Sequence, residues 1–177
     1  MDRRQRAKLR RACRPARVGL LFVGESPPAS GRFFYCGDSG LYRAMRDAFG
    51  AAGLSREDET FLAAFQSAGC YLVDLCPEPV DRLDRVSRRA ACQASEKSLA
   101  RTIAQLQPTM VATLLRSIEP NVARAAAMAG WRGPFLHLPY PGRWSRFRDA
   151  FLETLLPVLK KWLPSERQAA VIRARPA

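Results

Sequence analysis

A short apolar run that ends in a glycine, a carboxylate and two prolines constrains this chain most. Residues 18–23 read Val-Gly-Leu-Leu-Phe-Val, with five apolar residues in six positions. A continuous run of this length is typical of a strand buried on both faces, as in a parallel sheet. Gly24 ends the run, and Pro27 and Pro28 prevent a helix from starting at once. We therefore expect Glu25 in a loop at the carboxyl end of a central strand, where open α/β sheets bind ligands.

The rest of the chain alternates between helix-like and strand-like segments. Three more strands are expected, at residues 70–75, 109–115 and 135–138. Helices are expected at about residues 39–53, 57–65, 121–129 and 144–162. Another helix is expected to end near residue 107, after residues 80–92, which form either a basic loop or the start of that helix. This alternation predicts a three-layer α/β/α sandwich with a central four-stranded parallel sheet. We expect one domain over residues 18–163, between a basic tail at 1–17 and a loose basic tail at 164–177. Pro157 is expected to kink or break the last helix.

The charge of the chain favours a polyanionic partner. Lys and Arg number 29 against 16 Asp and Glu, a formal net charge of +13, and only four of the 29 are Lys. The planar arginine fork pairs with phosphate in a bidentate way, which favours nucleic acid. Codon usage in a high-GC genome is the alternative explanation of the arginine excess. Residues 1–17 hold eight of the cations and either form a solvated tail or lie along a phosphate backbone.

Apolar runs and cysteines indicate in which compartment of the cell the protein is expected. No apolar run approaches the roughly 20 residues of a membrane span. The five cysteines are an odd number without a Cys-x-x-Cys pair, so a disulfide framework is not expected. We therefore expect a cytoplasmic protein that binds no membrane.

Several short segments match, in order, the motifs of a known family. Gly24-Glu-Ser-Pro27 resembles a Gly-Glu-Ala-Pro-Gly first motif, and Tyr35-Cys-Gly-Asp-Ser-Gly40 resembles Phe-Val-Gly-Arg-Ala-Gly. Gly53-Leu-Ser-Arg-Glu57 and Cys76-Pro-Glu-Pro79 resemble Gly-Leu-x-Arg-Glu and Cys-Arg-Pro-Pro. Leu138-Pro-Tyr-Pro141 stands where the family has His-Pro-Ser-Pro. Over about residues 18–160 the chain resembles the uracil-DNA glycosylase superfamily, closest to its bacterial and archaeal iron–sulfur type.

This resemblance implies a monofunctional DNA glycosylase of base excision repair. Such an enzyme flips uracil or another deaminated base out of DNA and hydrolyses its N-glycosidic bond. By position, Glu25 would act at the sugar and its water, and Tyr140 would act beside the base. Phe34 or Tyr35 would stack on the base, and Asp74 would face its pairing edge. Further substrate contacts are implied for Gly24, Ser26, Pro27, Pro139 and Pro141, and DNA contacts for Arg32, Arg143 and Arg146.

The chain departs from the family at three functional positions, one of which is Tyr140 in place of the second-motif Ser. Leu138 replaces the second-motif His, and strand alternation turns the only histidine, His137, to the other side. Stabilisation of the leaving base would then come from backbone N–H groups, Tyr140, Arg143 or Asn121. Asp74 replaces the usual Asn, and a carboxylate accepts from uracil N3–H but repels O4. We therefore expect slow action on uracil or a preference for another base, with residues 139–143 forming the wedge that enters the duplex.

Cysteine positions argue against a cofactor. Cys76 and Cys92 match two ligands of the iron–sulfur type, but the close N-terminal pair is missing and Cys13 stands alone. Four thiolates normally hold a cubane cluster, so we expect no cofactor and no metal. We expect the protein to act on DNA as a monomer.

Three alternative functions remain open. The chain could be a catalytically weak or inactive nucleic-acid-binding member of the same fold. It could be a serine hydrolase that uses Ser39, although the Gly-x-Ser-x-Gly motif is absent. It could bind a small nucleotide, although no glycine-rich phosphate loop supports this.

Overall fold

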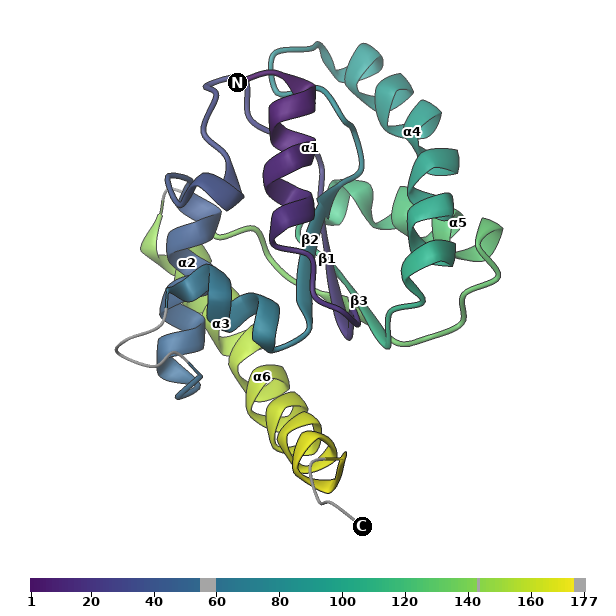
Figure 1. Ribbon diagram of the computed structural model, residues 1–177. Helices are drawn as coiled ribbons and strands as arrows, with labels where there is room; N and C mark the ends of the chain where they lie inside the picture. The colour runs from purple at the N-terminus through teal and green to yellow at the C-terminus, as the bar shows by residue number, and fades with distance from the viewer. Residues whose placement is uncertain (55–59, 143, 174–177) are drawn as a thin grey trace.

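The computed structural model describes residues 1–54, 60–142 and 144–173, with backbone alone from residue 162 onward. Its centre is a four-stranded sheet in the order β2-β1-β3-β4 (Figure 1). The strands are β1 (Leu20–Gly24), β2 (Cys70–Asp74), β3 (Met110–Thr113) and β4 (Phe135–His137). Every neighbouring pair is parallel, which confirms the predicted sheet.

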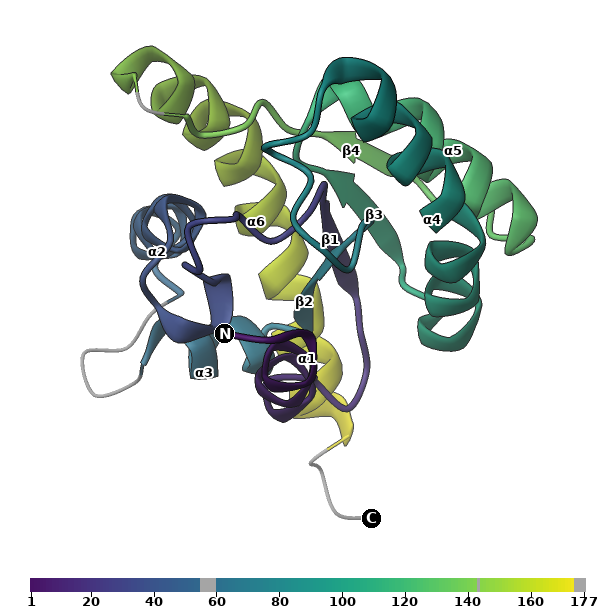
Figure 2. The same cartoon turned by 90° about the horizontal axis from the view of Figure 1, so that it is seen from above.

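Helices cover both faces of this sheet (Figures 1 and 2). One layer holds α2 (Gly40–Ala51), α3 (Phe61–Ser67) and α6 (Ser145–Arg173), and the other holds α4 (Arg85–Leu106) and α5 (Glu119–Met128). Two short 3-10 helices are η1 (Phe34–Cys36) and η2 (Arg116–Ile118). The three-layer α/β/α sandwich is therefore confirmed. No helix in the described ranges is both long and apolar enough to cross a membrane.

The apolar run that constrains the sequence is the centre of the core. All five residues of β1 are buried, and Leu20 to Val23 are 0% exposed. The helix expected after Ser39 begins there, because the Ser39 hydroxyl accepts a hydrogen bond from Tyr42 N at 3.1 Å. Residues 57–59, part of another expected helix, lie outside the described residues, and α3 begins at Phe61.

The N-terminal segment is an ordered helix and not a solvated tail, which was one of the two states expected for it. Residues Arg3–Ala12 form α1, which begins with a capping box between Asp2 and Gln5. Arg6 is buried and donates hydrogen bonds to Pro77 O at 3.0 Å and to Glu78 at 2.9 Å. The solvated-tail alternative is wrong because arginines of α1 donate hydrogen bonds to acceptors more than 60 residues away, which fixes the helix beside the edge strand β2. A contact of this segment with a phosphate backbone stays a prediction.

The C-terminal segment also differs. Helix α6 runs from Ser145 to Arg173, so of the kink or break expected at Pro157 the break does not occur. Residues 164–173 are helical rather than loose, and residues 174–177 lie outside the described residues.

Tyr35 belongs to the core rather than to a ligand site. Its side chain is 4% exposed, and its hydroxyl donates to Leu72 O at 2.9 Å and accepts from Leu72 N at 2.8 Å. Strand β2 lies at the sheet edge, so Tyr35 satisfies two backbone groups that no neighbouring strand pairs. Burial raises the pKa of the Tyr35 hydroxyl well above its ordinary value, which keeps it a donor.

Replacement of Tyr35 by Phe should therefore lower stability. It leaves the buried N–H and C=O of Leu72 unpaired, which costs about 2 kcal/mol of unfolding free energy. Urea denaturation measures this loss. Tyr42→Phe is the matched control, because the Tyr42 hydroxyl has no hydrogen bond within the described part of the chain. Equal stability of the two variants would contradict the structural role of Tyr35.

Candidate active site

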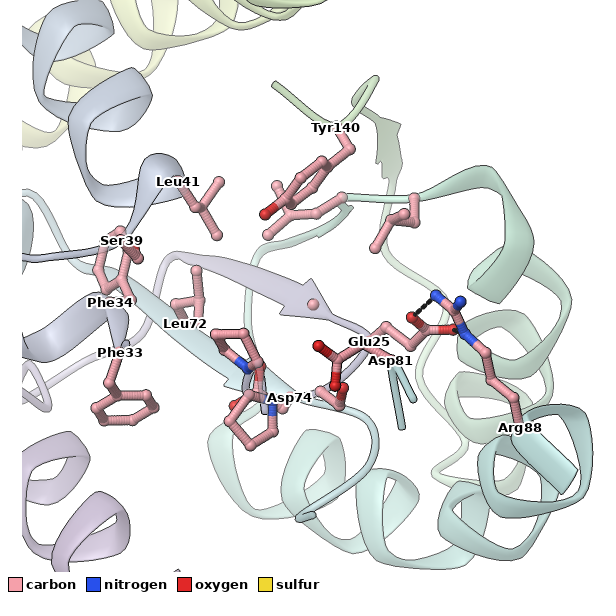
Figure 3. Close-up of a pocket in the computed structure, with 16 residues that line it drawn as sticks. Glu25, Phe33, Phe34, Ser39, Leu41, Leu72, Asp74, Asp81, Arg88 and Tyr140 are labelled. Carbon is pink, nitrogen blue, oxygen red and sulfur yellow. Dashed lines mark hydrogen bonds and ion pairs between the residues drawn. The ribbon is translucent and has the colours of Figure 1, made fainter. Parts of the chain in front are cut away.

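A cavity of about 280 Å³ opens at the carboxyl ends of the strands (Figure 3). Segments that follow all four strands contribute to its wall. Glu25 follows β1, Asp74 ends β2, Leu115 follows β3 and Tyr140 follows β4. This is the place at which open parallel sheets bind ligands, as the sequence predicts.

Glu25 is held at one wall of the cavity by an arginine of α4. The residue is 8% exposed, and Arg88 Nε donates to its Oε1 at 2.8 Å while Arg88 Nη2 donates to Oε2. These hydrogen bonds raise the pKa of Arg88. The paired fork fixes the orientation of the carboxylate, so Glu25 does not cap loop backbone. Sequence reasoning missed Arg88 as a site residue, although the run of arginines after β2 was a signal.

Glu25 also borders a second, more basic hollow. This hollow has a volume of about 460 Å³. Arg85, Arg88, Arg89 and Arg124 line it. Glu25 thus lies at the boundary between an apolar cavity and an arginine-rich one.

Asn121 lies in the arginine-rich hollow and not in the cavity. Its side-chain amide donates to Glu96 Oε1 at 2.7 Å, and Arg124 holds the same carboxylate from the other side. These bonds with Asn121 and Arg124 lower the pKa of Glu96. The expectation that Asn121 stabilises a leaving base is therefore wrong, because its amide is bound to a structural ion pair.

Asp74 forms the second buried carboxylate of the site. Its Oδ2 accepts from Arg10 Nη2 at 2.6 Å, whereas its Oδ1 has no hydrogen-bond partner among the described residues. Burial raises the pKa of Asp74, and Arg10 and Arg6 partly offset this rise. A Cβ at Gly24 would lie only 3.1 Å from Asp74 Oδ1, so glycine leaves the room that this oxygen needs.

Aromatic side chains close the cavity. Phe34 lines the cavity from η1, whereas Tyr35 does not. Of the two rings predicted to stack on a base, only Phe34 is therefore in a position to do so. Tyr140 reaches over the cavity from the segment after β4 and is 44% exposed (Figure 3). Desolvation and the nearby Asp74 raise the pKa of Tyr140. Phe33, which sequence reasoning did not select, also lines the cavity and packs under the Arg10 guanidinium.

The first-motif loop is built as the sequence predicts. Ser26 and Pro27 line the cavity next to Gly24. The Ser26 hydroxyl accepts a hydrogen bond from Val80 N at 3.3 Å, which ties this loop to the one after β2. Ser26 is therefore a structural link at the cavity and not a free nucleophile.

Other predicted contacts lie outside the cavity wall. Pro139 does not line it, and Pro141 is buried beside a different hollow that Tyr140 shares. Arg32 and Arg146 are exposed, and the Arg146 guanidinium lies 4.9 Å from the Phe147 ring centre. Arg143 lies outside the described residues.

The histidine of the chain does not reach the cavity. Leu138 is 1% exposed, while the exposed His137 contacts Thr113 Oγ1 at 3.1 Å and Glu119 Oε1 at 3.3 Å. This confirms that His137 points to the other side of the strand and plays no part in the cavity.

The cysteines do not fit an iron–sulfur cluster. Cys76 and Cys92 are buried with their sulfur atoms 3.7 Å apart, and burial raises the pKa of Cys92 to about 12. The described part of the chain holds no group of three or more candidate metal ligands. Four thiolates hold a cubane cluster, and only two thiols meet here.

Fold and site together define a three-layer α/β protein with a carboxylate-bearing cavity between parallel strand ends and an arginine-rich rim. The family model of the uracil DNA glycosylase superfamily matches residues 11–170, and the chain belongs to this superfamily. A comparison with curated proteins gave no match.

The Arg10–Asp74 pair predicts a pH-dependent stability. Arg10→Gln leaves a buried carboxylate unpaired and should lower the unfolding free energy by roughly 2–4 kcal/mol at neutral pH. The pKa of Asp74, already raised, rises further in this variant. The native state then binds the Asp74 proton more tightly than the unfolded chain, so the loss shrinks as the pH falls through the acid range.

Urea denaturation at several pH values measures this loss. The matched control places Arg10→Gln in an Asp74→Asn background, where the cost of the arginine change should largely disappear. A loss of unfolding free energy that is independent of both pH and residue 74 would contradict the pairing of Arg10 with Asp74.

Proposed function

We propose that this protein is a monofunctional DNA glycosylase that acts on a flipped-out base in base excision repair. The position of Glu25 carries the proposal, because this carboxylate borders both the cavity and the arginine-rich hollow. A flipped nucleotide has the same two parts, a flat base and an anionic sugar–phosphate. With the base in the cavity and the phosphates in the hollow, the glycosidic bond lies beside Glu25.

The chemistry needs a fixed carboxylate at that place. As the bond from C1′ to the base nitrogen breaks, its electron pair leaves with the base and the sugar becomes cation-like. Glu25 stabilises this cation and accepts a proton from the water whose oxygen bonds to C1′. Arg88 acts through Glu25 as a positioning residue, because both of its donors hold the carboxylate.

Stabilisation of the departing base falls to Tyr140. Its hydroxyl lies at the cavity, and its raised pKa keeps it protonated and able to donate to a base oxygen. Backbone N–H groups and Arg143 are proposed as the other groups that stabilise the departing base.

Asp74 supports a proposal about which bases the site accepts. With Oδ2 paired to Arg10, the free Oδ1 accepts hydrogen bonds and repels a carbonyl oxygen. A base that presents an N–H group at this place suits the site better than uracil, which also presents O4. We therefore propose slow action on uracil and a preference for another base.

DNA is the proposed partner, and the protein acts as a monomer without a cofactor. Arg32 and Arg146 are exposed and available for phosphate contacts. Arg143 is also proposed to contact phosphate. The two neighbouring thiols of Cys76 and Cys92 act as packing groups and not as cluster ligands.

A second candidate is a nucleic-acid-binding member without catalysis. The observation that favours it is the engagement of both Glu25 oxygens by Arg88. Such a protein would bind DNA in a salt-sensitive way and release no base.

Glu25→Gln separates the two candidates. The protein is incubated with oligonucleotides that each carry one uracil, hypoxanthine or xanthine, and alkali cleavage reveals abasic sites. We expect base release to fall at least about 100-fold in the variant, because a general base is lost, with DNA binding retained. The exposed Glu153→Gln is the control and should release base normally. Salt-sensitive binding without release by the unmodified protein would establish the second candidate.

Asp74→Asn tests base selection. An amide can accept from N3–H and donate to O4, so uracil release relative to other bases should rise about 10-fold or more. The ratio of initial rates on matched oligonucleotides measures this. Fast uracil release by the unmodified protein, unchanged in Asp74→Asn, would refute the role of Asp74.

A further inference from the structure

The start of α4 exposes two aliphatic side chains. Leu83 is 44% exposed and Val86 is 78% exposed, the highest value among the large hydrophobic residues that the structure describes. Val86 is held in the first helical turn, because the side chain of Asp84 accepts from Val86 N at 2.9 Å and from Ser87 N at 3.1 Å. Two aliphatic side chains three positions apart thus stand in solvent, Leu83 just before the capped start of α4 and Val86 in its first turn.

Cations surround this apolar pair. Arg82, Arg85 and Arg89 flank it, and none of the three forms an ion pair within the described ranges. Arg85 and Arg89 also line the hollow beside Glu25. The three arginines outnumber Asp81 and Asp84 in this segment. Cations around an apolar tip complement a polyanion that also offers apolar surface, and the stacked bases of duplex DNA offer this between two phosphate backbones.

The pair is rigidly linked to the candidate active site. The Asp81 carboxylate accepts from Ala29 N at 3.1 Å, and Leu83 N donates to Val80 O at 3.1 Å. These bonds fix the segment to the loop at the cavity. Val86 precedes Arg88 by two residues, so their side chains point about 200° apart around the helix. Because Arg88 faces Glu25, Val86 faces outward.

The helix also begins on the appropriate side of the molecule. Figure 2 shows that α4 begins on the side to which the strands point, as does the segment before α6 that carries Tyr140. DNA that delivers a base to the cavity must approach from this side. The tip of α4 would then meet the duplex next to the base that leaves the stack.

We propose that Leu83 and Val86 form an apolar wedge that enters the base stack of duplex DNA. Arg82, Arg85 and Arg89 hold the flanking phosphates. This wedge is separate from residues 139–143 and lies on a different element. Side chains of this kind partly unstack a base step and so offset the cost of extruding a base from a duplex. The inference rests on the proposed function for the identity of the ligand.

The double variant Leu83→Ala with Val86→Ala tests the wedge. A single-stranded substrate has no partner strand to open, so only duplex reactions need the wedge. We expect the ratio of duplex to single-strand base release to fall about 10-fold or more, because unstacking costs a few kcal/mol per step. Met128→Ala is the control, since Met128 is 55% exposed at the end of α5, and it should leave the ratio unchanged.

A second readout keeps the test independent of catalysis. 2-Aminopurine placed beside the target base in a duplex becomes more fluorescent when its stack opens. The unmodified protein should raise this fluorescence on binding, and the double variant should not, even if neither protein releases a base. An unchanged duplex ratio together with an unchanged fluorescence rise would overturn the proposal. Loss of self-association in the double variant, with DNA opening intact, would overturn it as well and assign the pair to a contact between copies.

Discussion

Two buried carboxylates at the ends of adjacent parallel strands organise this molecule. The register pairs Gly24 of β1 with Asp74 of β2, so Glu25 and Asp74 both lie at the carboxyl ends of their strands, where both line the cavity. Buried charge is costly unless it is paired, and each carboxylate has its own arginine, Arg88 for Glu25 and Arg10 for Asp74. Since one arginine comes from α4 and the other from α1, the two pairs join the outer helices to the cavity.

These ion pairs are better explained by the way they orient the two carboxylates than by their contribution to the stability of the fold. A buried ion pair often contributes little net stability, because desolvation offsets its attraction. In the described structure Arg10 Nε is buried and has no hydrogen-bond partner, which is itself a cost. Burial nevertheless raises the pKa of Asp74. What the arginines do achieve is a fixed direction for each carboxylate, with one oxygen of Asp74 left without a hydrogen-bond partner among the described residues. A site that discriminates between bases needs that fixed direction.

Much of the architecture was predictable because it depends on local patterns. The apolar run of β1, the Ser39 cap and the alternation of strands and helices all lie within short windows, and the superfamily motifs follow the same order. Glu25, Asp74, Phe34 and Tyr140, which line the cavity, were also predicted, Glu25 and Asp74 from strand ends and all four from the resemblance to the superfamily motifs. Arg88 and Arg10 were not, because their partners lie 63 and 64 residues away. No local pattern encodes such pairs.

Adjacent aromatic residues show the same limit. Phe34 and Tyr35 occupy neighbouring positions in one loop, yet only Phe34 lines the cavity, because the 3-10 turn directs Tyr35 towards Leu72. Likewise, the sequence of α1 is compatible with a solvated tail, because the acceptors of Arg6 and Arg10, Glu78 and Asp74, lie far away along the chain.

The most direct test of this account is the structure of the Glu25→Gln protein bound to a duplex that carries its preferred base. The account predicts an extruded base against Phe34 and beneath Tyr140. The flanking phosphates should lie against Arg85 and Arg89, with the glycosidic bond next to residue 25. DNA bound on another face, or an intact stack over an empty cavity, would contradict it.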